Sequence, residues 1–174
     1  MSHYSTQDVD SSLRVGLLVK RCGSLLSMVG EAALESRPLS LLGFMVLRSL
    51  QKQSPMSPSE LSTKTAYDMG GLTRVVDDLE KVGLVKRERS RDDRRSVQIT
   101  ITPLGIRQAD QSLAAIVGLL NQILEPFSKR EVEALVSSLQ RLAERLQEYV
   151  ETRPRARPRL TPSKPVRAST RSTR

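Results

Sequence analysis

The fold of this chain is decided by residues 57–105, which read SPSELSTKTAYDMGGLTRVVDDLEKVGLVKRERSRDDRRSVQITITPLG. Three kinds of local signal follow one another in this stretch. Two helix starts come first, then a helix end, and then two strand-like runs separated by a polar segment, the second of which alternates Val97, Ile99 and Ile101 with polar residues. Together they predict two short helices joined by a tight turn and followed by a β-hairpin.

Capping residues mark the two helix starts. Ser57 is followed by proline and stands three residues before Glu60, which is the spacing of a capping box with proline at the first helical position. This pattern predicts a helix that ends at about Thr65. Asp68 is the expected cap of the next helix, which we predict to run to about Val82.

The second helix is predicted to end at Gly83, and strands are expected at 84–89 and 97–101 around the wholly polar segment 90–96. One buried stripe is predicted on this helix, formed by Met69, Leu72, Val75, Val76, Leu79 and Val82. Two helices followed by a hairpin make a winged helix-turn-helix. The expected fold class is therefore mainly α, with six helices and a two-stranded β wing.

The second helix of such a pair enters the major groove of DNA, with its N-terminal residues nearest the bases. We expect the backbone N–H groups of Gly70 and Gly71 to approach a phosphate. Thr73 and Arg74 stand on the exposed face, where their side chains can reach phosphates or base edges. The aspartates at 77–78 count against this assignment because carboxylates repel phosphates, and a solvated polar helix face is the alternative.

The predicted hairpin has a basic tip. Residues 86–95 contain six basic and three acidic side chains, and an arginine at a narrow hairpin tip can enter the minor groove. Arg91 and Arg94 are the candidates for this contact. Ser57 and Ser59, at the start of the first helix of the pair, complete the set of expected DNA contacts. On charge alone a solvated loop fits as well, and the preceding capped helices favour the wing.

Residues 57–105 resemble the MarR family of bacterial transcription regulators, and the order of the six helices extends the resemblance from about residue 13 to 150. The family's hallmark is Asp-x-Arg, five further residues and then Leu-Thr. It appears here as Asp93, Arg95, Ile101 and Thr102, with isoleucine in place of leucine.

The resemblance implies roles for individual residues and for the flanking helices. Thr73 and Arg74 would contact DNA, Arg94 would be the wing-tip arginine, and the pair of Asp93 and Arg95 would brace the wing. The first, fifth and sixth helices would interlock two chains. Small aromatic or phenolic acids bind many members between the dimerisation helices and the DNA-binding lobe, and some relatives sense peroxides through a cysteine in the first helix.

Helices are also predicted at 13–36, 40–53, 103–125 and 128–150. A lobe of residues 40–102 cannot cover three further amphipathic helices, and long exposed apolar stripes are unusual in a monomer. A two-fold homodimer is therefore expected, and a monomeric helical bundle is the alternative. The chain is divided into a mobile N-terminus (1–12), an N-terminal dimerisation helix (13–38), a winged helix-turn-helix lobe (39–102), C-terminal dimerisation helices (103–151) and a disordered basic tail (152–174).

The charge of the chain is concentrated in its tail. The 174 residues carry a formal net charge of +9, and 152–174 contain eight basic residues and no acid, so 1–151 carry +1. Basicity alone therefore does not show that the folded part binds nucleic acid. No apolar run approaches the roughly 18 residues of a membrane span, and the start is unlike a signal peptide, so we expect a cytoplasmic protein that does not bind membranes.

The chain lacks the residues that most enzymes and metal sites need. One cysteine, Cys22, and one histidine, His3, exclude a disulfide framework and a multi-cysteine metal site. No nucleophile–base pair and no phosphate-binding glycine loop are present, so we expect neither an enzyme nor a cofactor. Cys22 falls in the apolar stripe of the first predicted helix, which favours a buried structural cysteine. Its neighbours Lys20 and Arg21 keep a redox role open.

The sequence thus predicts a homodimeric, sequence-specific DNA-binding regulator, a repressor relieved by a small ligand, which would read a pseudo-palindromic operator. Arg14, Lys20, Arg21 and Arg48 could pair with an anionic effector, although solvated surface is the more common fate of such groups. Two alternatives are a redox-sensing regulator of the same fold that acts through Cys22 and a winged-helix adaptor that binds proteins.

Overall fold

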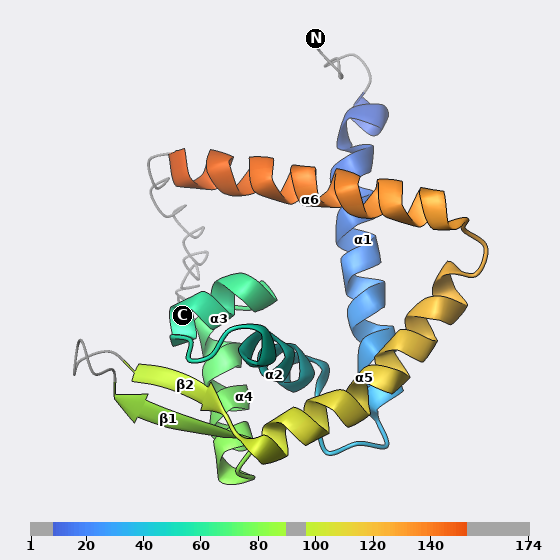
Figure 1. Ribbon diagram of the computed structural model, residues 1–174. Coiled ribbons are helices and arrows are strands. Elements are labelled where there is room, and N and C mark those ends of the chain that lie inside the picture. The colour runs from blue at the N-terminus through green and yellow to red at the C-terminus, as the bar shows by residue number, and fades with distance from the viewer. Residues whose placement is uncertain (1–8, 90–96, 153–174) are drawn as a thin grey trace, which may run out of the picture. The chain divides into compact units, whose positions relative to one another are not determined.

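The computed structural model describes residues 9–89 and 97–152, with side chains from residue 13 onward (Figure 1). The elements, in chain order, are α1 (Val9–Leu34), α2 (Leu41–Lys52), α3 (Pro58–Thr65), α4 (Met69–Lys81), β1 (Val85–Arg89), β2 (Val97–Ile101), α5 (Pro103–Leu124) and α6 (Lys129–Thr152). The chain divides into two compact units between Pro126 and Phe127. The first contains α1 to α5 with the hairpin, and the second contains α6.

The core of the first unit lies around α2, which packs against α3, α4, α5 and β2. Its apolar side chains come from every element of the predicted lobe. Burying each of them contributes about 1.5–3 kcal/mol relative to an exposed position. The largest fully buried apolar side chains of the described residues are Leu34, Leu47, Leu50, Met56, Leu61, Leu72 and Ile99.

The predicted helix signals are confirmed. The Ser57 hydroxyl accepts the N–H of Glu60 at 3.3 Å, and the Glu60 carboxylate accepts the N–H of Ser57 at 2.7 Å, which is the capping box at the start of α3. Asp68 caps α4. Gly83 follows α4 with a φ of 73°, a conformation that glycine adopts without strain.

The two strands pair as predicted, antiparallel, with Val85 opposite Ile101. The segment 53–57, which joins α2 to α3, adds a contact to this sheet. The Met56 N–H donates to the Ile99 carbonyl at 3.0 Å, and the Ile99 N–H donates to the Met56 carbonyl at 2.8 Å. The loop before α3 is therefore fixed to the hairpin, which holds the helix pair and the wing in one body.

Two predictions need correction, one about the bounds of a helix and one about the extent of a buried stripe. The first helix spans Val9–Leu34 and not 13–36. On α4 the buried stripe is limited to the middle of the helix, because Met69 and Val82 stand at its two ends, where they are 46% and 59% exposed. Neither end of α4 is covered by the core that α2 and α3 form with it.

The apolar face of α1 is largely uncovered within a single chain. In the first unit α1 contacts α2 and α5, and its buried residues, Gly30 and Leu34, lie near its C-terminal end. The prediction of a buried Cys22 is wrong for the single chain, since Cys22 is exposed. The exposed large apolar side chains of α1 are Leu13, Val15, Leu17, Leu18, Val19, Leu25, Leu26 and Met28.

The start of α5 is pressed against the end of α4. The Thr102 hydroxyl accepts the N–H of Gly105 at 3.1 Å and donates to the carbonyl of Gly83 at 2.8 Å. A Cβ placed on Gly105 would lie 2.2 Å from the backbone oxygen of Leu84. Only a glycine allows this approach, and α5 is thereby attached firmly to the lobe.

The second unit consists of α6, which starts with the predicted capping box. The Ser128 N–H donates to the Glu131 carboxylate at 2.8 Å. None of the described residues of α6 is buried, and its exposed apolar residues include Leu135, Leu139 and Leu146. Across the described residues, no helix combines the length and the apolar character that a membrane crossing requires.

Candidate nucleic-acid interface

The exposed face of α4 presents the two residues that the sequence analysis placed on DNA. Thr73 and Arg74 are both exposed. The Thr73 hydroxyl donates to the carbonyl of Met69 at 2.7 Å, which leaves the hydroxyl oxygen able to accept a hydrogen bond. Among the residues that the structure describes, none forms a salt bridge with Arg74. Its guanidinium, whose charge helps to lower the pKa of Asp68, can bind a phosphate or a guanine edge.

The expected role of Gly70 and Gly71 needs correction. Their N–H groups donate to one carboxylate oxygen of Asp68, at 2.9 and 3.0 Å. These hydrogen bonds, first that of Gly71 and then that of Gly70, hold the pKa of Asp68 below its usual range. The cap is therefore ionised at neutral pH, and the two N–H groups that were expected to meet a phosphate already have an anionic partner. The small glycines instead leave room for close approach beside Thr73.

The carboxylate of Asp77, which counted against a DNA-facing α4, is paired with a wing residue. The Arg87 guanidinium lies 2.6 Å from Asp77 and 2.7 Å from Glu80, and the Arg87 N–H donates to Glu80 at 3.0 Å. Partial burial acts to lower the pKa of Arg87, but the hydrogen bonds and charges of both carboxylates outweigh it and the net pKa is raised. The side chain is thus a permanent cation between β1 and α4.

This three-residue bridge was missed by sequence reasoning, which counted Arg87 among the basic wing residues and assigned the bracing to Asp93 and Arg95. Only the spacing of Asp77 and Glu80, three residues apart on one helix face, could have indicated it. Asp93 and Arg95 lie outside the described residues. Asp78 is also neutralised, because its carboxylate lies 2.9 Å from the ammonium of Lys81.

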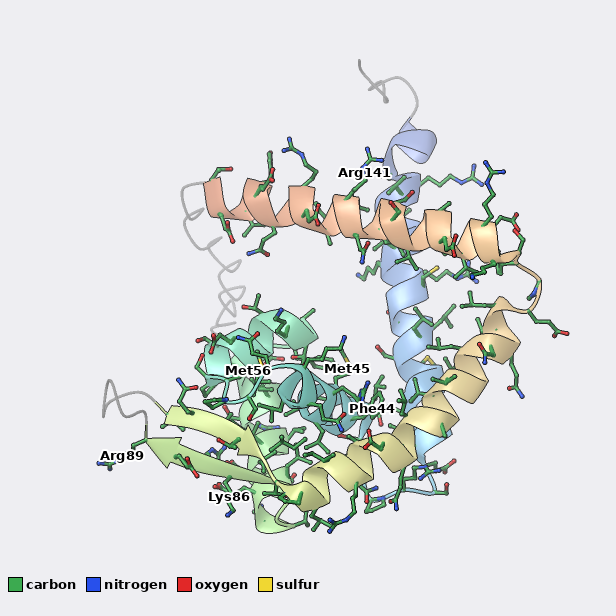
Figure 2. All side chains as sticks on the ribbon, in the orientation of Figure 1. Phe44, Met45, Met56, Lys86, Arg89 and Arg141 are labelled. Carbon is green, nitrogen blue, oxygen red and sulfur yellow. The ribbon has the colours of Figure 1, made fainter. Side chains whose placement is uncertain are left out.

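Two other wing cations have no acidic partner in the part of the chain that the structure describes. Lys86 and Arg89 are exposed on β1, and neither has a salt bridge to any residue of the described ranges 9–89 and 97–152. Figure 2 shows both side chains projecting away from the core of the unit. The predicted minor-groove contacts, Arg91 and Arg94, lie outside the described residues.

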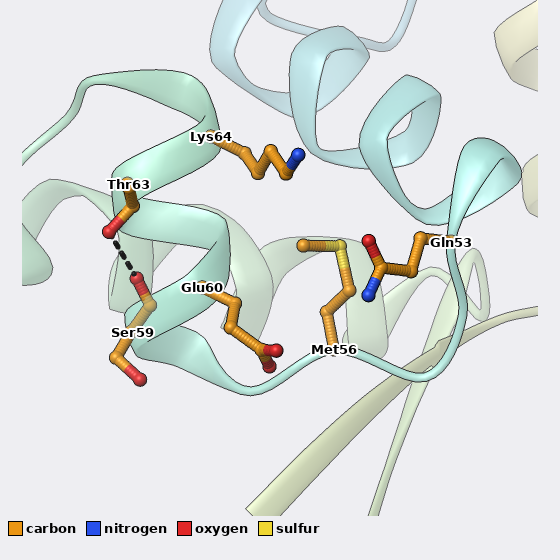
Figure 3. A pocket seen from close by; sticks show the side chains of 6 residues that line it. All are labelled: Gln53, Met56, Ser59, Glu60, Thr63 and Lys64. Carbon is orange, nitrogen blue, oxygen red and sulfur yellow. Dashed lines mark hydrogen bonds between the residues drawn. The ribbon is translucent and has the colours of Figure 1, made fainter. Parts of the chain in front are cut away.

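The start of α3 carries the remaining candidates. The Ser57 hydroxyl is occupied by its capping box and lies 3.1 Å from the hydroxyl of Ser59. Ser59 is exposed beside an open hollow of about 250 Å³ (Figure 3). Ser57 therefore has a structural task that the sequence predicted, whereas Ser59 lines the hollow together with the Glu60 carboxylate. Lys64 lines the same hollow and was not singled out from the sequence.

The Arg87 bridge leads to a prediction for DNA binding. Arg87→Ala should weaken DNA binding about tenfold, because it detaches β1 from α4 and leaves two uncompensated carboxylates beside the duplex, each worth up to about 1 kcal/mol per subunit. Fluorescence anisotropy with labelled duplex measures the effect. Lys129→Ala removes a paired cation from α6, outside the proposed interface, and should change the affinity less than about twofold. Equal affinities of the two variants would contradict the bridge, and Asp77→Asn should recover part of the Arg87→Ala loss.

A second feature of the first unit is a crevice between α2 and α5. It has a volume of about 320 Å³ and an apolar wall that includes Phe44 and Met45 (Figure 2). Arg48 and Lys52 also line it, and no carboxylate does. The crevice can hold an apolar body with a negative charge. The full lining is Phe44, Met45, Arg48, Ser49, Lys52, Leu113, Ile116, Val117 and Leu120.

Comparison with known proteins agrees with this geometry. The sequence profile of the MarR family matches residues 39–97. The HTH-type transcriptional regulator SarZ of Staphylococcus haemolyticus is 33% identical over 111 residues, which are 63% of this chain and 73% of SarZ. The transcriptional regulator BldR of Sulfolobus solfataricus is 27% identical, with a TM-score of 0.73 over 80% of this chain and 99% of BldR. CouR of Rhodococcus jostii, solved with p-coumaroyl-CoA bound, shares the fold at 24% identity, with a TM-score of 0.66 over 74% of this chain and 91% of CouR.

Proposed function

The chain belongs to the MarR family of transcriptional regulators, and from this premise we propose that it acts as a homodimeric, ligand-responsive repressor of a pseudo-palindromic operator. The family is one of non-enzymatic DNA-binding proteins. In the proposed complex α4 enters the major groove and the hairpin follows the adjacent minor groove. Arg91 and Arg94 stay the expected minor-groove contacts, with Asp93 and Arg95 as the wing brace.

The observation that carries this proposal is the charge arrangement on α4 and β1. Three of the four described acids on α4 and β1 are paired, Asp77 and Glu80 with Arg87 and Asp78 with Lys81. The fourth, Glu88, is exposed and forms no salt bridge within the described residues. The cations Arg74 and Arg89 have no such partner among the described residues. A surface on which most carboxylates are paired, and on which two arginines have no acidic partner within the described residues, attracts a polyanion even though the body of the chain is nearly neutral.

The uncovered apolar side chains of α1 support the homodimer. A row of exposed large apolar residues on a 26-residue helix is costly for a monomer in water. A two-fold axis would bring the same face of a second copy against it, since a closed dimer uses one surface twice. Two copies of α4 about 34 Å apart would then read two half-sites of one operator.

Selection from a random duplex library tests both parts of the proposal. We expect the full-length protein, in the presence of polyanion competitor, to enrich an inverted repeat with half-site centres about 10 bp apart. Analytical ultracentrifugation at micromolar concentration should give twice the mass of the 19.4 kDa chain. Enrichment of no sequence over random duplex, or a monomer at that concentration, would contradict the proposal.

The crevice between α2 and α5 is the proposed effector site, and a small aromatic acid is the proposed class of ligand. Its apolar wall suits a ring, and Arg48 and Lys52 suit a carboxylate. The ligand that the CouR structure contains, p-coumaroyl-CoA, joins an aromatic group to an anionic one. A ligand that prefers one arrangement of the lobe would change DNA affinity by linkage.

A redox response through Cys22 is the second candidate, because the structure exposes this thiol, and a reactive cysteine needs such access. Treatment with a stoichiometric hydroperoxide should then release the protein from its DNA, and Cys22→Ser should abolish the release. Unchanged DNA binding of the treated protein would remove this candidate.

A further inference from the structure

A polar cluster joins α2 to α5 at the edge of the crevice. Arg48 of α2 lies 3.5 Å from the carboxylate of Asp110 on α5. The Gln51 amide donates to the same carboxylate oxygen at 3.0 Å and also reaches the carbonyl of Ile106 at 3.4 Å. Arg48 in turn donates to the amide oxygen of Gln51. The Asp110 carboxylate thus receives contacts from two polar side chains of α2, those of Arg48 and Gln51.

Asp110 stands beside the apolar wall of the crevice. Leu113 and Val117 follow it at helical spacings of three and seven, so the three residues share one face of α5. Leu113 and Val117 line the crevice, as does Arg48. The Asp110 carboxylate therefore already holds the guanidinium that a carboxylate ligand in the crevice would need.

We propose that Asp110 is a built-in competitor for the anionic ligand of this crevice. This inference rests on the proposed function, since it assumes that the crevice takes an amphiphilic carboxylate. A ligand that pairs with Arg48 must displace Asp110, and it must tolerate the nearby negative charge while it does so. The concentration at which the protein responds is therefore set by Asp110 as well as by the fit of the ligand.

The same exchange would couple the crevice to the lobe. With Asp110 displaced, Gln51 keeps its 3.4 Å contact to the Ile106 carbonyl, but the contacts of Gln51 and Arg48 to the Asp110 carboxylate are lost, so the attachment between the two helices weakens on one side. Since α2 lies at the centre of the lobe core and contacts α3 and α4, a shift of α2 against α5 moves the DNA-reading helices with it.

Titration of two matched ligands tests the proposal by calorimetry on the full-length protein. The ligands are 2-naphthoate and its neutral analogue 2-naphthamide. Asp110→Asn keeps an oxygen acceptor for Gln51 and removes the charge. We expect this variant to bind 2-naphthoate about fivefold more tightly than the natural chain, which is the scale of one half-exposed ion pair together with the repulsion it relieves. The affinity for 2-naphthamide should change less than about twofold by the same reasoning.

Asp78→Asn is the control variant, because it removes one paired surface acid of the same unit away from the crevice. It should leave both affinities unchanged. Equal binding of 2-naphthoate by Asp110→Asn and the natural chain would overturn the competition while leaving the effector site in place. An equal gain for 2-naphthamide would overturn the charge argument. If neither ligand binds any variant, the crevice takes no such ligand and both proposals about it fail, whereas DNA binding by the same samples would still support the DNA-binding role.

Discussion

Arg74→Ala is expected to lower the affinity for the selected operator by about 10²–10⁴-fold. A good bidentate contact between arginine and guanine contributes about 1–3 kcal/mol, and a two-fold complex makes the contact twice. Arg74 is placed for this contact, since it is exposed in the N-terminal half of α4 and has no salt bridge within the described ranges. Fluorescence anisotropy against operator and random duplex measures the loss.

The pattern of the loss matters as much as its size. If Arg74 reads a base, Arg74→Ala should bring the operator affinity close to the affinity for random duplex. If it contacts only a phosphate, both affinities should fall together and the salt slope should become smaller. Arg141→Ala removes an exposed arginine from α6 (Figure 2) and should change the operator affinity less than about twofold. An Arg74→Ala variant that binds as well as this control would favour the protein-binding adaptor.

Gly105→Ala is expected to destabilise the fold by about 3 kcal/mol, the upper part of the range for inserting a methyl group into a packed site. The added Cβ would lie 2.2 Å from the Leu84 oxygen and 2.9 Å from Cγ1 of Ile101. The first neighbour is backbone at the start of the hairpin, so it cannot move without disturbing β1. For a chain of this size the melting temperature should fall by about 6–12 °C, which thermal unfolding followed by circular dichroism measures.

Gly118 provides a matched control on the same helix. A Cβ at Gly118 meets no atom within 4 Å. Gly118→Ala should therefore be neutral or stabilise α5 by up to about 1 kcal/mol, since alanine favours the helix interior. A melting temperature of Gly105→Ala equal to that of Gly118→Ala would show that the start of α5 is not packed as closely as described.

The helix and strand order was predictable because its signals are local. The capping box of Ser57 and Glu60 and the cap at Asp68 involve residues at most three positions apart, so the sequence shows donor and acceptor side by side. Gly83 needs only its own backbone conformation to end α4. The exposed faces of Thr73 and Arg74 follow from helical spacing. Local capping chemistry and periodicity were therefore sufficient for the elements and for the choice of α4 as the reading helix.

The partners of the charged groups depended on the tertiary structure. Arg87 meets Asp77 because β1 folds back along α4, and Arg48 meets Asp110 because α5 crosses α2, 62 positions further along the chain. Solvent exposure also depends on the tertiary structure. Cys22 belongs to the apolar stripe predicted for the first helix, yet no described element of its own unit covers it. The periodicity of apolar residues indicates which helix and strand faces can be buried, and the sequence shows which charged side chains need a partner. Which group supplies that partner is decided only when distant segments are brought within a few ångströms of each other, where Coulomb and packing energies become large enough to matter.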